Sequence, residues 1–309
     1  MNPEIRRAAE ILRAGGLVAF PTETVYGLGA DASSATAVAR LYTAKGRPQD
    51  HPVIIHFSSA EKAFAWGREI PQAARKLAAR FWPGPLTLIL KRSEKARDFI
   101  TGGQDSVGLR VPSHPVAREL LREFGGGVAA PSANLFGNLS ATSAAHVDEA
   151  LKAELVLDGG ASEIGIESTI VDLSDGMPVL LRPGRISRED LEKELKIQIE
   201  NRNSLSPRHS GGLERHYSPK TPALLVPAHA LDAEIAGRGN AVAVLAFSRP
   251  DERVEFWIRM PRAPRAYAQR LYAALRELDG AKCGAILIET PPESAEWDAI
   301  RDRLTRATG

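Results

Sequence analysis

Short apolar runs alternate with amphipathic stretches along the first two-thirds of the chain. The runs Leu17 to Phe20, Val53 to Phe57 and Leu86 to Leu90 have the length and composition of buried strands. Helices are predicted between them, from about Ser34 to Ala44 and from Pro71 to near Phe81, because proline suits the first turn of a helix. This alternation of strand and helix predicts an α/β or α+β domain of roughly 190 residues.

The pattern continues beyond the third of these strands. Further elements are predicted as strands at Val107 to Val111 and near Val128, Leu155, Thr169 and Val179, and as helices over Val116 to Phe124 and from Ser187 to near Leu195. Pro21 interrupts the first strand, since proline has no backbone N–H to donate to a sheet. Thr22 to Ala30 is therefore expected to be a loop at the end of that strand.

A polar segment divides the chain into two parts. Residues 201–222 are rich in serine, proline, glycine and charge, which predicts a linker or a lid between a first domain over residues 1–200 and a second over residues 223–309. In the second part, apolar strands at Ala223 to Val226, Ala241 to Phe247 and Ala285 to Glu289 surround a helix from Pro264 to Leu278. They predict a small Rossmann-like α/β domain, in whose sequence no catalytic or binding motif is recognised.

The composition is that of a globular protein. At 309 residues the chain exceeds the usual size of one domain, and its hydrophobic fraction of 43% can form a core without metal or disulfide support. A formal net charge of +2 is too balanced to favour wholesale binding to nucleic acid or membrane. The single cysteine, Cys283, excludes an internal disulfide and a multi-cysteine zinc site, and we expect a cytoplasmic protein.

Cationic and hydroxyl side chains recur where predicted strands end. Lys45 and Arg47 lie on one tight segment; such a pair is usually a solvated surface, and its functional alternative is a phosphate clamp. Arg110 alternates with apolar neighbours on a strand, so either a substrate carboxylate or a protein carboxylate is implied as its partner. Arg182 is a second arginine borne on a strand, next to a Pro-Gly pair.

The remaining polar candidates have ordinary structural explanations when each is taken alone. Ser132 and Asn134 suit a turn, and a lone histidine such as His56 after an apolar strand is more often structural than functional. Gly27-x-Gly29-x-x-Ala32 resembles a dinucleotide-binding fingerprint only weakly. The sequence contains no phosphate loop, nucleophile elbow or His-Glu-x-x-His helix, so the usual NTPase, serine hydrolase and zinc protease classes lose support.

Seven short motifs in one order resemble the YrdC-like threonylcarbamoyl-adenylate synthases. They are Pro21 to Gly29, Lys45-Gly46-Arg47-Pro48 with His56, Trp82 to Thr87, Ser106 to Pro112, Ala130 to Asn134, Glu167-Ser168-Thr169 and Leu181 to Gly184. The linker motif His216-Tyr217-Ser218-Pro219, followed by an α/β domain, resembles the long two-domain branch of that family. The resemblance implies a YrdC-like twisted sheet with flanking helices as the first domain.

The resemblance also implies a reaction and a site. L-Threonine, bicarbonate and ATP would give threonylcarbamoyl-AMP and pyrophosphate, with magnesium accompanying ATP, and the product would serve the modification of adenosine 37 in tRNA. Threonine would be bound by Thr24, His56, Arg110, the backbone at Ala130, and Ser168. The nucleotide site would be lined by Lys45, Arg47, His51, Ser106, Ser132, Asn134, Ser140, Arg182 and Tyr217, of which Lys45 and Arg47 would be catalytic.

Two positions depart from the family pattern, and two other functions stay open. Ser106 stands where threonine is expected, and His51 where a small polar residue is more usual. An RNA-binding module is one alternative, although the balanced charge disfavours high affinity and predicts at most weak, salt-sensitive contact with tRNA. A carbamoyltransferase of the hydrogenase-maturation type is the other, and it usually has zinc-binding cysteines that this sequence lacks.

Overall fold

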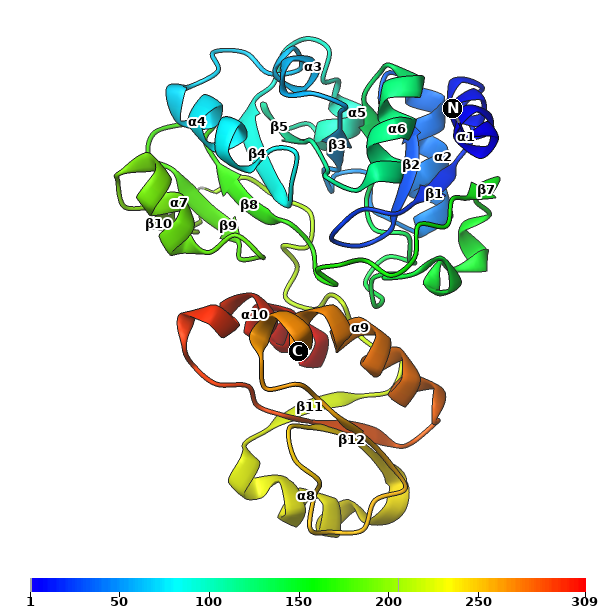
Figure 1. The fold of residues 1–309 in the computed structure, drawn as a ribbon, viewed down its shortest axis with the longest axis vertical. Helices are drawn as coiled ribbons and strands as arrows, with labels where there is room; N and C mark the ends of the chain where they lie inside the picture. Colours follow the sequence, from blue (N-terminus) through cyan, green and yellow to red (C-terminus); the bar gives the residue numbers. More distant parts are fainter. Residues whose placement is uncertain (1, 205) are drawn as a thin grey trace.

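The computed structural model describes residues 2–204 and 206–309, which form two domains joined by a long connection (Figure 1). Within the described residues the first domain contains a ten-stranded mixed sheet in the order β10-β9-β8-β4-β5-β3-β6-β2-β1-β7. Its strands are β1 (Val18–Phe20), β2 (Gly27–Asp31), β3 (Ile54–His56), β4 (Leu86–Lys91), β5 (Ser106–Arg110), β6 (Val128–Ala129), β7 (Leu155–Val156), β8 (Thr169–Asp172), β9 (Val179–Arg182) and β10 (Glu200–Asn201).

Helices cover this sheet unequally on its two faces. They are α1 (Pro3–Arg13), α2 (Ala35–Lys45), α3 (Ala60–Phe64), α4 (Gln72–Phe81), α5 (Asp98–Thr101), α6 (Pro115–Phe124) and α7 (Arg188–Leu195), with short 3-10 turns at Ala144–His146 and Glu149–Leu151. Local sequence fixes their ends as expected. Ser187 and Asp190, for example, form a capping box at the start of α7, which satisfies backbone donors that a helix leaves free.

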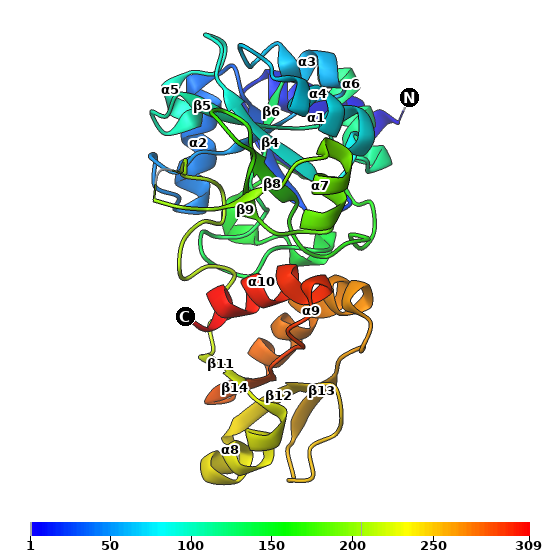
Figure 2. The ribbon, with the colours of Figure 1, turned by 90° about the vertical axis from the view of Figure 1, so that its left-hand side faces the viewer.

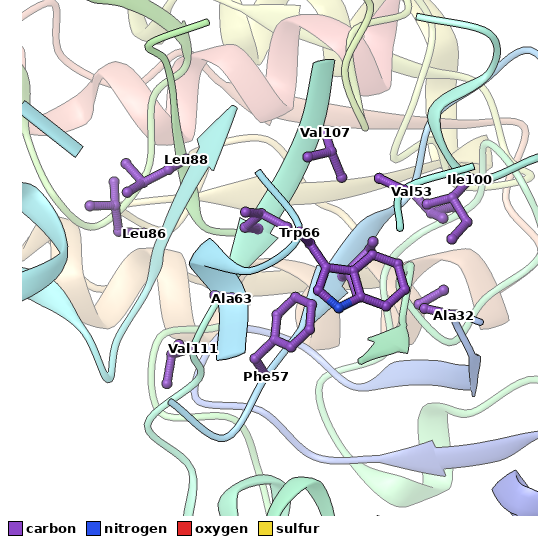
Figure 3. Packing of buried hydrophobic residues seen from close by; sticks show 14 of the residues in the cluster. Ala32, Val53, Phe57, Ala63, Trp66, Leu86, Leu88, Ile100, Val107 and Val111 are labelled. Carbon is purple, nitrogen blue, oxygen red and sulfur yellow. The ribbon is translucent and has the colours of Figure 1, made fainter. Parts of the chain in front are cut away.

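The larger core lies between the sheet and helices α2, α3, α4, α5 and α7. Figure 3 shows part of it, where the rings of Phe57 and Trp66 pack together with a centroid separation of 5.6 Å. A smaller core lies on the opposite face, where α1 and α6 pack on Val18, Phe20 and Val128. The rest of that second face carries the cluster Ile54, Ile89, Ile170, Val179 and Leu181, which leaves room for a site beside it.

One predicted loop is largely a strand. Residues 27–31 form β2, antiparallel to β1 and to β6, rather than part of a loop over Thr22 to Ala30. Gly29 looks like a turn residue in the sequence, but a Cβ there would lie 2.9 Å from atoms of both Phe20 and Val128. The glycines of this segment therefore permit close packing. They do not form a dinucleotide-binding turn before a helix.

The second domain is a small parallel sheet with helices on both faces. The order of its strands is β11 (Ala223–Val226), β14 (Ala285–Glu289), β12 (Val242–Ala246) and β13 (Phe256–Arg259), all parallel. Helix α8 (Leu231–Arg238) packs on one face, and α9 (Pro264–Gly280) and α10 (Asp298–Thr308) pack on the other. Figure 2 shows α9 and α10 between this sheet and the first domain. Short 3-10 turns complete the domain at Ala228–Ala230, Gly239–Ala241 and Ala295–Trp297. The described part of the chain holds no helix long and apolar enough to cross a membrane.

The two domains touch through backbone as well as side chains. Gly165 of the first domain has a φ of +79°, and a Cβ there would come within 2.4 Å of the Cα of Gln269 and 2.6 Å of the carbonyl oxygen of Ala268, both in α9. Only glycine fits this approach, because the neighbouring atoms are helix backbone and cannot turn away.

This contact predicts that Gly165→Ala destabilises the protein in two ways: through the positive φ, and through the clash with α9. The matched control Gly160→Ala has almost the same φ, +78°, and no atom within 4 Å of its Cβ position. The control should lose only the conformational preference, about 1–2 kcal/mol. Gly165→Ala should lose about 1–3 kcal/mol more, because α9 must move. Thermal unfolding of both variants measures the difference, and equal melting temperatures would contradict the close domain contact.

Candidate active site

A cavity opens on the sheet face that α1 and α6 leave uncovered, and the linker closes over it. Its wall includes most of the residues predicted from the sequence: Thr24, Lys45, Arg47, His56, Arg110, Ala130, Ser132, Asn134, Ser168, Arg182 and Tyr217. These residues come from the ends of strands, from turns and from the linker. The scattered cationic and hydroxyl groups therefore converge on one space.

Strand register sets two of these side chains next to one another. His56 on β3 is the parallel partner of Arg110 on β5, and Thr87 on β4 faces Arg110 from the other side. Because side chains alternate along a strand, His56 lies on the same face as Ile54, away from the larger core. The sheet therefore presents Arg110 and His56 together to the cavity.

Arg182 reaches the same face through an irregularity in β9. Val171 pairs with Leu180, whereas the preceding Ile170 pairs with Arg182, so Leu181 is an extra residue in the strand. A bulge of this kind changes the face to which the following side chain points. Arg182 consequently lies beside Ser168, with Nε donating to its carbonyl oxygen at 3.0 Å and Nη2 to its hydroxyl at 3.1 Å.

Lys45 and Arg47 flank the residue that ends α2. Gly46 caps this helix in the left-handed conformation, and both flanking side chains turn inward and are almost fully buried. Lys45 Nζ donates to the carbonyl oxygens of Ser132 and Asn134. Burial and the neighbouring Arg47 charge hold the pKa of Lys45 well below its ordinary value.

Arg47 has carbonyl and aromatic partners. Its Nε and Nη2 donate to the carbonyl oxygens of His51 and Pro52 at 3.2 and 2.7 Å. Its guanidinium carbon lies 5.3 Å from the centre of the Phe136 ring. Burial also lowers the pKa of Arg47. The pair is therefore not the solvated surface that isolated charges usually form.

The buried cations differ in their counter-ions. Arg110 has a protein carboxylate, since its Nη2 lies 2.7 Å from Glu23 Oε1, while Nη1 donates to Thr24 Oγ1 at 2.9 Å. In the described part of the chain, Lys45, Arg47 and Arg182 make no ion pair and contact only carbonyl, hydroxyl and ring groups. A cluster of buried cations without carboxylates is costly and favours an anionic ligand.

Two histidines in the wall are neutral. Burial, with the nearby Arg110 charge, lowers the pKa of His56 to about 3, and burial lowers that of His216 to about 3. The Nδ1 atoms of both histidines and Oδ1 of Asn134 are buried without a partner among the described residues. Since buried polar atoms are rarely left unsatisfied, these three atoms are available to a ligand.

Three predicted residues lie off the wall. His51 packs against Phe136 with the ring centroids 5.3 Å apart and the ring planes nearly perpendicular, and it does not line the cavity. Ser106 lies in an adjoining small pocket beside Arg208 and His209 of the linker. Ser140 is fully buried behind Glu167, to which its hydroxyl donates at 2.5 Å.

Other wall residues were missed or given no role by the sequence motifs. Phe136 gave no signal, because an aromatic residue in a turn has no distinctive spacing. His216 and Glu167 belong to recognised motifs, but nothing in the sequence shows that the linker histidine and the carboxylate reach the same cavity. No group of three or more His, Cys, Asp or Glu side chains that could hold a metal ion is found in residues 2–204 and 206–309.

The chain matches two family models that together span most of its length. Residues 10–184 match the Sua5, YciO and YrdC family, described as telomere recombination, and residues 186–309 match the C-terminal domain of threonylcarbamoyl-AMP synthase. The threonylcarbamoyl-AMP synthase of Pyrococcus abyssi is 41% identical, covering 99% of this chain and 94% of the relative. That of Bacillus subtilis is 38% identical, covering 100% and 94%.

Solved structures agree with the sequence matches. Pyrococcus abyssi Sua5 in complex with L-threonine superposes with a TM-score of 0.92 at 39% identity, over 99% of this chain and 94% of that one. Escherichia coli YciO matches the first domain, with a TM-score of 0.52 at 25% identity over 59% of this chain. The chain belongs to the Sua5/YrdC family of threonylcarbamoyl-AMP synthases, in the branch that carries both domains.

Proposed function

We propose that this chain is a nucleotidyltransferase that makes threonylcarbamoyl-AMP and pyrophosphate from L-threonine, bicarbonate and ATP. The observation that carries the proposal is the cavity in which Lys45, Arg47 and Arg182 are buried without carboxylate partners among the described residues. Arg110, in the same cavity wall, is paired with the carboxylate of Glu23. Relatives that are threonylcarbamoyl-AMP synthases support the product, and the threonine-bound Pyrococcus abyssi structure supports the amino-acid substrate.

The polyphosphate would lie against the three unpaired cations. Phosphate oxygens are stronger acceptors than the carbonyl groups that Lys45 and Arg47 now contact, so binding would compensate charges that the protein leaves uncompensated. Ser132, Asn134 and Tyr217 would provide the remaining contacts of this nucleotide side. His51, Ser106 and Ser140 would support it from behind or beside the wall.

Threonine would lie on the other side, against Arg110. The Glu23 carboxylate holds this guanidinium in place. The side of the guanidinium that faces the cavity would bind the substrate carboxylate. Thr24, Ser168 and the backbone of Ala130 supply short polar contacts. Neutral His56 presents an unpartnered Nδ1 that can bond a substrate group without adding charge.

The reaction needs positioning more than a protein nucleophile. The threonine amine attacks the carbon of bicarbonate and water leaves, giving a carbamate; a carbamate oxygen then attacks the α-phosphorus of ATP while the bond to the β-phosphate oxygen breaks. Holding both reactants in one cavity makes the second step effectively intramolecular. The cations stabilise the charge that accumulates on the phosphates, and magnesium brought by ATP would share that task.

The product would then leave for tRNA. Threonylcarbamoyl-AMP is a mixed anhydride, so the class of reaction that consumes it is acyl transfer to an amine, here N6 of adenosine 37 in tRNA. A separate threonylcarbamoyl transferase would carry out that step, and any contact of this chain with tRNA would be weak given its balanced charge.

Pyrophosphate release tests the proposed reaction directly. With ATP and bicarbonate, the protein should release pyrophosphate when L-threonine is added and release much less with L-serine or without amino acid. Lys45→Met is the negative control, since it removes a cation that contacts phosphate in this proposal. Pyrophosphate release that is independent of threonine would overturn the assignment.

Two arginine-to-lysine variants should separate the two substrate sides. Lysine keeps the positive charge but loses the planar fork, so Arg110→Lys should raise the KM for threonine about tenfold, or 1.4 kcal/mol, with little change for ATP. Arg182→Lys should do the reverse. Each variant is the control for the other. Steady-state kinetics, with threonine and ATP varied in turn, measure the two KM values. Parallel changes in both KM values for both variants would contradict the division of the cavity.

Nucleotide binding should weaken as the pH rises. The pKa of Lys45 is held well below its ordinary value, so raising the pH converts the ammonium to the neutral amine that phosphate does not favour. Phosphate binding should raise that pKa and take up a proton. Calorimetry at a series of pH values above the titration of ATP and below the ordinary pKa of lysine measures the effect. In Lys45→Met the dependence on pH should disappear; a flat profile in the unaltered protein contradicts this role of Lys45.

A further inference from the structure

Glu167 is the one carboxylate among the described residues that line the cavity. It lies just before Ser168, whose carbonyl and hydroxyl oxygens hold Arg182. Burial alone would raise the pKa of its carboxyl group, but the charges of Arg303 and Arg182 and the bond from Ser140 outweigh burial and lower it. The cavity that is to receive a polyphosphate thus contains an ionised carboxylate, which needs a counter-charge.

That counter-charge comes from the second domain. Arg303 of α10 is fully buried, and its Nε lies 2.7 Å from Glu167 Oε2. The same guanidinium donates to the carbonyl oxygens of Pro183 at 3.0 Å and of Glu167 itself at 3.3 Å. Tyr272 of α9 adds a bond from its hydroxyl to Glu167 Oε2 at 3.0 Å. Two helices of the second domain therefore bind one carboxylate in the wall of the first.

The neighbouring charges leave Arg303 available to Glu167. Arg303 also lies 2.7 Å from Asp302, but Asp302 has a second cation in Arg306, at 3.0 Å. Two acidic and two basic groups therefore form one network, in which Glu167 and Arg303 are buried and Asp302 and Arg306 are partly exposed. Loss of Arg303 would leave Glu167 with the charge of Arg182 for compensation.

We infer that Arg303 is a positioning residue of the active site: it neutralises Glu167, so that Arg182 stays directed at the nucleotide and the phosphate side of the cavity keeps its net positive charge. The inference rests on the proposed function and assigns the second domain a part in nucleotide binding. Without Arg303, the carboxylate would repel the phosphates and attract Arg182 away from them.

Direct binding of a non-hydrolysable ATP analogue tests this assignment. Arg303→Met should raise the Kd for the analogue at least tenfold, and the double variant Glu167→Gln/Arg303→Met should restore it to within about threefold of the unaltered protein, because both charges are then absent. A purely structural role would weaken threonine binding as much as binding of the analogue. Binding of threonine, measured separately, should change less than binding of the analogue.

Two further variants keep the test decisive. Arg303→Lys preserves the charge but loses the planar fork, so it should bind the analogue more tightly than Arg303→Met. Arg270→Met, an exposed arginine of α9, is the control and should bind normally. Normal binding by folded Arg303→Met, no recovery in the double variant, or binding by Arg303→Lys as weak as that by Arg303→Met would each overturn the inference alone. An unaltered protein that fails to bind the analogue would overturn the proposed function as well.

Discussion

The fold has to bury several positive charges in one cavity without enough carboxylates to neutralise them. Lys45, Arg47 and Arg182 are each surrounded by carbonyl and hydroxyl oxygens, which satisfy their donors but not their charge. A buried ion that is not paired costs several kcal/mol even after such solvation. Free energy gained elsewhere, in the two cores of the first domain and the contact between the domains, must offset this cost.

The sheet satisfies this requirement by bringing distant segments to one face. Parallel pairing of β3 with β5 sets His56 beside Arg110, and the bulge in β9 brings Arg182 to the same side. The end of α2 turns Lys45 inward from the other direction. None of these groups is near another in sequence, so the charge density of the cavity is a property of the strand order.

The elements of this fold were largely predictable from the sequence, whereas the site was predictable only in part. Runs such as Leu86 to Leu90 are mostly apolar because their residues are buried on both faces of the sheet, and the spacing of Ser187 to Asp190 predicts the start of a helix. Thr22 to Ala30 was wrongly expected to be a loop, because glycines that permit close strand packing look the same in sequence as glycines that permit a turn. The local sequence cannot distinguish the two kinds of glycine, because the difference lies in the tertiary contacts.

The orientation of the predicted site residues depends on long-range geometry. The bulge at Leu181 decides where Arg182 points, and no local signal fixes it. His51 and Ser140 are expected at the nucleotide; in the structure they contact Phe136 and Glu167, which line the cavity. A motif match locates a residue within a region, and the neighbouring side chains then determine whether it reaches the ligand.

The second domain illustrates the same limit most clearly. Arg303 lies in a charged segment that reads as a solvated helix surface, yet it is fully buried because α10 packs against Glu167, Pro183 and the linker. Its guanidinium also lies 5.3 Å from the ring centre of Tyr217, which lines the cavity. The contact between the domains buries this charge, and the Glu167 carboxylate compensates it there. The charges at the interface between the domains and the charges in the active site therefore act on one another.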